Sequence, residues 1–195
     1  KLRGANLTQA DLNNINLSSA NLKEAILSEA NLSQANLTGA NLSNACLEGA
    51  NLIQADFSNT NLSHATFSDS RGENPADLIG VDFSGANLSG VNFSGVDLTA
   101  TDLRQTNLQK VEFSSETRLI DVNFYGANLT RVNFSGVDLT AATLSETNLQ
   151  KAEFSYAKLN DANLSGANLI KANLSGANLS GANLTEVNLC GAYLE

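Results

Sequence analysis

The strongest constraint on this 195-residue chain is a five-residue repeat that runs along almost its whole length. A Leu or Phe occupies every fifth position from Leu2 to Phe67, and the same spacing resumes after each of two interruptions. We number each repeat from this large apolar residue, called position i. Position i−2 is usually Ala or Val, i−1 is usually Asn or Asp, i+1 is usually Ser or Thr, and 13 of the 14 Gly residues lie at i+2. Such a short fixed period predicts a solenoid of stacked units.

Five residues match neither the 3.6-residue period of a helix nor the two-residue period of a long strand. They do fit a three-residue extended segment followed by a corner. Alternate side chains of an extended segment point in opposite directions, so i−2 and i face inward while i−1 faces water. Positions i+1 and i+2 form the corner, where Gly adopts backbone angles that other residues disfavour. We therefore expect the chain to wind around a Leu-filled axis that leaves no room for a ligand, with any function on its exterior.

The repeat is most regular at 162–184, which reads ANLSGANLIKANLSGANLSGANL. This pattern resembles the A(N/D)LXX consensus of the pentapeptide repeat family, and the resemblance covers essentially the whole chain. It implies an all-β fold, namely a right-handed quadrilateral parallel β-helix with four repeats per coil. The 38 repeats would form about 9–10 coils, a rod roughly 46 Å long at about 4.8 Å per coil. We expect a single domain over residues 1–195.

The register of the repeat slips twice, near 68–77 and near 114–118. Successive large apolar residues are eleven positions apart at the first slip and six at the second. If each slip adds one residue at a corner, residues 20 apart stack, or 21 apart across a slip. Both slips then fall on the same corner of the rod. The same rule predicts that four aromatic residues form one interior ladder: Phe93, Phe113, Phe134 and Phe154.

Composition argues against several classes of function. The net charge is −9 with a pI of about 4.5, and the 11 basic residues look scattered along the sequence. Because phosphate binding needs clustered Lys and Arg, direct nucleic-acid binding is disfavoured. No apolar run approaches the roughly 18 residues that a membrane-spanning helix needs. Lys1 already lies inside the repeat, so we expect further chain upstream and caps beyond both ends.

Catalysis, a cofactor and a metal site are all disfavoured by the residues present. His64 is the single histidine, and no nucleophile motif, phosphate-binding loop or metal-spaced set of Cys and His occurs. Cys46 and Cys190 should face outward, too far apart for a disulfide, and remain two free thiols. Free thiols suit a reducing compartment, so we expect a cytoplasmic location, with a domain of a membrane-anchored protein as the alternative.

The Asp residues are the best candidates for contact with a partner. By the stacking rule, Asp77, Asp97 and Asp138 line one face, while Asp82 and Asp102 stack on the adjacent face. These columns could be a solvated acidic stripe, a surface for a basic protein or a weak cation site. Loops on a regular scaffold often carry function. We therefore add three loop residues to the candidate contacts: Glu73, Asn74 and Glu116.

A regular repeat with no recognisable set of catalytic residues predicts a structural scaffold whose outer faces bind a protein. What the resemblance adds is context: the family is abundant in cyanobacteria, and similar long rods serve heterocyst differentiation and heterocyst glycolipid deposition. The alternative comes from fluoroquinolone-resistance members of the family, which mimic DNA and bind DNA gyrase. Acidic columns favour that alternative, but a charge of −9 over roughly 46 Å is sparse beside one charge per about 1.7 Å in duplex DNA. The oligomeric state stays open.

Overall fold

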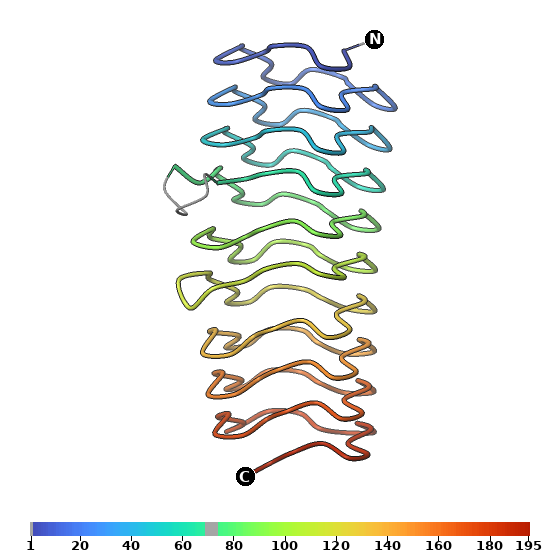
Figure 1. The fold of residues 1–195 in the computed structure, drawn as a ribbon, viewed down its shortest axis with the longest axis vertical. Helices are drawn as coiled ribbons and strands as arrows, with labels where there is room; N and C mark the ends of the chain where they lie inside the picture. The colour runs from blue at the N-terminus through green and yellow to red at the C-terminus, as the bar shows by residue number, and fades with distance from the viewer. Residues whose placement is uncertain (1, 69–73) are drawn as a thin grey trace.

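The chain coils into a rod with its two termini at opposite ends (Figure 1). This computed structural model describes residues 2–68 and 74–195. Its regular structure consists of isolated parallel bridges, each one residue long, and successive bridges join residues 20 apart, as in Asn6↔Ile26 and Ile26↔Cys46. Among the described residues no helix is long and apolar enough to cross a membrane. The expected all-β, parallel β-helical architecture is confirmed.

Each coil has four sides because four bridges occur per 20 residues, always at position i−1. We name the sides by their first bridged residue: face D begins at Asn6, face A at Asp11, face B at Asn16 and face C at Asn21. Each further member of a face lies one coil later in the chain than the member before it. The chain passes from face D to A, B and C before it returns to D, so four corners separate the faces.

A tight turn forms each corner. The backbone N–H of residue i+3 donates to the carbonyl of residue i, as from Ala25 to Leu22 at 2.9 Å. The residue at i+2 has positive φ, which Gly adopts without strain. The polar residue at i−1 also has a local role, since its side-chain oxygen accepts the N–H of i+1, as in Ser63 to Asn61 Oδ1 at 3.1 Å. This interaction explains the Asn and Asp preference, which the sequence pattern alone suggested only as exposure to water.

Backbone hydrogen bonds also join each coil to the next. Leu27 donates to the Cys46 carbonyl at 2.7 Å, Ile26 donates to the Ala5 carbonyl at 2.9 Å, and the same pattern recurs along the rod. A single coil would leave these groups unpaired, so the stack is stable only when several coils form together.

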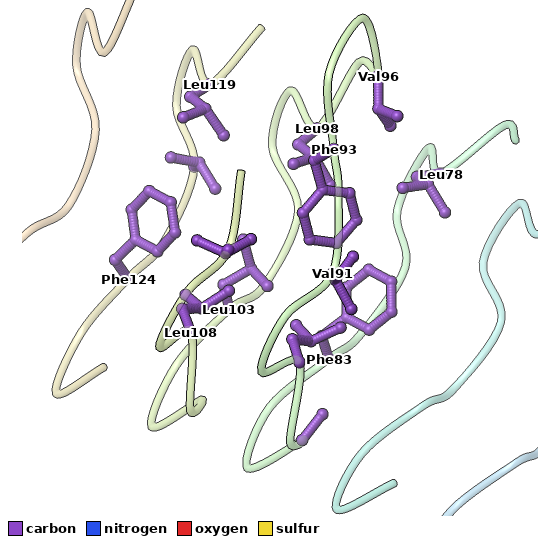
Figure 2. Close-up of a cluster of buried hydrophobic side chains, with 14 of the residues drawn as sticks. Leu78, Phe83, Val91, Phe93, Val96, Leu98, Leu103, Leu108, Leu119 and Phe124 are labelled. Carbon is purple, nitrogen blue, oxygen red and sulfur yellow. The ribbon is translucent and has the colours of Figure 1, made fainter. Parts of the chain in front are cut away.

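The interior is filled by the Leu or Phe of position i and the small residue of position i−2. From Leu22 to Leu174 nearly all of these side chains are buried. Faces A and C supply only Leu, whereas the Phe residues project from faces B and D and meet across the axis, as Phe67 and Phe83 do at 5.9 Å. Figure 2 shows Phe83, Phe93 and Phe124 directed into this shared interior.

The predicted aromatic ladder is confirmed. On face D the ring centroids of Phe93 and Phe113 lie 6.1 Å apart, those of Phe113 and Phe134 5.2 Å apart, and those of Phe134 and Phe154 5.1 Å apart. The rings are close to parallel at every step. Phe67 extends the ladder by one further coil, at 5.2 Å from Phe93.

The first register slip differs from the prediction. Asn51 bridges Asp77, a step of 26 residues rather than 21. Leu78 takes the core position on face A one coil after Leu52, so 26 residues separate two positions that a regular coil places 20 apart. Gly72, where the repeat predicts a large apolar residue, lies outside the described residues. The second slip has the expected 21-residue step. Both slips follow face D and so share one corner, as predicted.

Candidate protein-interaction surface

Buried apolar side chains fill the interior of the described part of the rod, so we look for functional residues on its surface. Within residues 2–68 and 74–195, no group of three His, Cys, Asp or Glu is placed to hold a metal ion. Two hollows on the surface are lined by residues of successive coils. The candidate contacts therefore belong to the exposed columns at i−1 and to the corner that contains both slips.

Face A carries a column of mixed charge, in which basic residues lie among the predicted Asp residues. Asp77, Asp97 and Asp138 do share this face, but Arg118 lies between Asp97 and Asp138 because one coil separates each successive pair. The Arg118 Nε atom lies 3.6 Å from Asp97 Oδ2, and Lys158 Nζ lies 3.1 Å from Asp138 Oδ2. The three Asp residues therefore share one face as predicted, and the prediction did not consider the charge of the residue between them.

Asp138 is held in its charged form. Burial alone would raise the pKa of its carboxyl group, but hydrogen bonds from the Thr140 hydroxyl and backbone amide, and from Lys158, outweigh burial and lower the pKa. The Asp138 carboxylate therefore already accepts hydrogen bonds from the turn and from Lys158, which leaves it little capacity to bind an external cation.

Face B holds the more continuous acidic column. The predicted pairing of Asp82 with Asp102 is confirmed, and Asp56 adds a third member one coil earlier. The extra member was missed because the first slip takes 26 residues. Arg104 lies 2.6 Å from Asp102 and neutralises that end of the column, while the Asp102 carboxylate in turn raises the pKa of the Arg104 guanidinium.

The corner after face D is where both slips interrupt the repeat, and we call it the loop corner, meaning residues 74–76 and 114–117. The backbone carbonyl of Asn74 accepts the N–H of Gly49 at 3.0 Å, and Ala76 donates to the Phe67 carbonyl at 2.6 Å. These bonds fix the end of the first loop onto the rod. Glu73, the other predicted contact here, lies outside the described residues.

The second loop is braced from inside. Buried Thr117 accepts a hydrogen bond from the Ser114 amide at 3.0 Å and donates to the Phe93 carbonyl at 2.9 Å. Glu116 projects outward from this support, and hydrogen bonds from Ser114 and Ser115 lower the pKa of its carboxyl group. The loop therefore presents a charged carboxylate from a fixed backbone. Figure 1 shows this loop at the side of the rod, near residue 115.

A shallow hollow lies beside the first loop. Its lining includes Pro75, Ile79, Gly95 and Asp97, and the Ile79 side chain is 63% exposed. No bridge joins Asp77 to Asp97 within the part of the chain that the structure describes, so the coils separate locally after the long slip. Ile79 was not predicted as a contact, although an apolar residue at position i+1 beside a register slip was a usable signal.

Comparison with known proteins points to one family. Residues 1–39, 35–71 and 157–195 match a model described as pentapeptide repeats, and residues 74–144 match a pentapeptide repeat region. No curated protein matches the sequence significantly.

Several solved structures are similar to this chain. HetL, a pentapeptide repeat protein involved in heterocyst differentiation regulation from the cyanobacterium Nostoc sp. strain PCC 7120, is 30% identical, with 97% of this chain and 89% of HetL covered and a TM-score of 0.39. QnrB1, a plasmid-mediated fluoroquinolone resistance protein, is 18% identical, with 88% and 84% covered and a TM-score of 0.44. Rfr23 from the cyanobacterium Cyanothece 51142 is 28% identical, with 56% and 87% covered and a TM-score of 0.29.

Proposed function

Because this chain belongs to the pentapeptide repeat family, we propose that it is a non-catalytic scaffold, a right-handed quadrilateral rod of about 9–10 coils that presents its exterior to a protein partner. The observation that carries the proposal is the loop corner. Elsewhere the rod is a near-uniform stack, whereas here Asn74 and Glu116 lie where the repeat is interrupted, and exposed Ile79 lies close by at the end of face A. Fixed loops on a rigid support are suited to recognition.

The process that such a partner would serve is also a proposal. HetL, whose sequence is 30% identical over nearly the whole chain, is involved in heterocyst differentiation regulation. We place this chain in the same setting, cyanobacterial heterocyst differentiation or the deposition of heterocyst glycolipids. The mixed charges of face A favour a partner with both acidic and basic groups over a purely basic one.

Affinity capture with matched variants tests the proposal. The loop-corner variant combines Glu116→Gln with changes at two residues of the hollow beside the first loop, Ile79→Ser and Asp97→Asn. The control variant makes the same changes in residue type at exposed or half-buried positions away from both loops: Ile170→Ser, Glu146→Gln and Asp161→Asn. A protein retained by the wild type and the control but lost with the loop-corner variant, and then bound directly after purification, supports the proposal. A partner lost equally with both variants contradicts the assigned surface.

The second candidate function is a DNA mimic that modulates DNA gyrase, and the stacked carboxylates of Asp56, Asp82 and Asp102 favour it. A gyrase supercoiling assay separates the two functions. Inhibition or protection of gyrase that disappears in a variant with all three Asp changed to Asn would support mimicry. No effect of the wild-type rod on supercoiling would exclude it.

A further inference from the structure

Four basic residues line up along the corner that follows face C, a feature hidden in the linear sequence. Each occupies position i+2 of a successive coil, and we call the group the basic ridge: Lys110, Arg131, Lys151 and Lys171. The backbone N–H groups of the last three donate to carbonyls of the next coil at 2.9–3.0 Å, which keeps this part of the corner in register. The expectation that the basic residues are scattered was therefore wrong.

The basic ridge is not neutralised by the rod itself. All four side chains are exposed, and none of the five ion pairs found among the described residues involves them. The neighbouring i−1 residues on face C in these coils are all Asn, which carry no charge. On face D, Glu112 and Glu153 follow Lys110 and Lys151 by two residues, and neither forms an ion pair within 4.0 Å among the described residues. A chain of net charge −9 thus gathers four of its 11 basic residues in one line.

Polar groups surround these cations. A shallow hollow of about 360 Å³ is lined by three members of the ridge and by the side chains that precede them: Gln109, Lys110, Thr130, Arg131, Gln150 and Lys151. Amide and hydroxyl donors beside a guanidinium and two ammonium groups can hydrogen-bond carboxylates, and a guanidinium can do so through two bonds at once. The hollow is therefore suited to anionic side chains.

We propose that the basic ridge binds an acidic α-helix of a partner protein. The four cations repeat at about 4.8 Å over roughly 14 Å. Helix residues at i, i+4, i+7 and i+11 share one face and span roughly 16 Å, a mismatch that flexible Lys and Arg side chains can absorb. Face D separates this surface from the loop corner, so it is a second interaction surface. Its test is independent of the test of the proposed function.

Other polyanions fit the ridge less well. Phosphates along one strand of duplex DNA repeat at about 3.4 Å, and the acidic columns of faces A and B would repel such a dense charge. Sequence-tolerant binding of single strands uses aromatic side chains on which bases stack, and no aromatic residue lies among the residues that line the hollow. An anionic membrane would meet a narrow corner of a protein of net charge −9.

Fluorescence anisotropy with a synthetic probe tests the proposal. The probe is a labelled 18-residue helical peptide with Glu at i, i+4, i+7 and i+11, compared with a scrambled peptide of the same composition. The ridge variant is Arg131→Gln with Lys151→Gln, because Gln34 and Gln54 already occupy the same turn position with positive φ. The control variant, Arg118→Gln with Lys158→Gln, removes the same charge from face A. Far-ultraviolet spectra check that both variants fold.

We expect the ridge variant to bind the patterned peptide about fivefold more weakly than the control variant, given the modest strength of exposed ion pairs. Binding that is equal for the ridge and control variants overturns the assigned surface. Equal binding of the patterned and scrambled peptides overturns the helical partner. Tighter, ridge-dependent binding of duplex DNA, single-stranded DNA or phosphatidylserine vesicles overturns the choice of partner class.

Discussion

Replacing Phe134 with Ala should lower the free energy of unfolding by about 4–5 kcal/mol, the upper part of the range for buried Phe. Phe134 is fully buried, and its ring lies 5.2 Å from Phe113, 5.1 Å from Phe154 and 6.2 Å from Phe124. The coils on either side are fixed by backbone hydrogen bonds, including Phe134 N–H to the Glu153 carbonyl at 2.7 Å. The space left by the ring therefore cannot close.

Phe134→Leu is the informative companion, because Leu fills every position i on faces A and C of the same rod. Leu restores most of the volume and loses mainly the ring–ring contacts, so we expect a loss of about 1–2 kcal/mol. Tyr156→Ala is the surface control. Its ring is 78% exposed, so the loss should stay within about 0.5 kcal/mol.

Urea denaturation followed by far-ultraviolet circular dichroism measures these differences, provided that the transition is cooperative. Repeat arrays can lose two-state behaviour, so amide hydrogen exchange across residues 129–154 serves as a second measurement. A loss below about 1 kcal/mol for Phe134→Ala would refute the tightly packed ladder. Equal losses for the Ala and Leu variants would show that the volume argument is wrong.

Three further outcomes follow from local contacts. Thr117→Ala removes both hydrogen bonds of the buried hydroxyl and should lower the unfolding free energy by about 1–3 kcal/mol, measured by urea denaturation. The lowered pKa of Asp138 stabilises the fold above about pH 4 and this contribution is lost as pH falls further, so melting temperatures of the wild type and Asp138→Asn should converge on acidification; parallel curves would contradict this. Exposed Cys190 should react with a thiol reagent faster than half-buried Cys46, and the reverse order would be inconsistent with the structure.

The sequence was sufficient for the parts of the fold that depend on period alone. Large apolar residues at every fifth position had to share one interior, and equal phase placed the Phe93–Phe154 ladder on one side. The sequence was insufficient at the first slip, because residue spacing alone does not show how many residues separate the bridged positions there. Counting residues suggested a 21-residue step at the first slip, whereas the bridge from Asn51 to Asp77 makes the step 26. That difference hid Asp56 from the acidic column of face B.

The charged surface was harder to predict because it depends on which residues the coils bring together on one face. Arg118 lies 21 residues from Asp97 and 20 from Asp138, so its place between them could be worked out only after the coil length was applied to every charge. The basic ridge carries the same signal, since its members are separated by 21, 20 and 20 residues. Candidate contacts were sought among Asp columns and loop residues, and the column of basic residues was overlooked.

The 26-residue step has a consequence for how such rods can change. Asn51 and Asp77 remain bridged although six additional residues separate them, and the aromatic stacking from Phe67 to Phe93 continues across the same step. Extra sequence at this corner therefore leaves the bridge and the ring stacking across the step in place. Lineages and protein engineers can lengthen or exchange such insertions to acquire new binding specificities, while the spine that displays them stays the same.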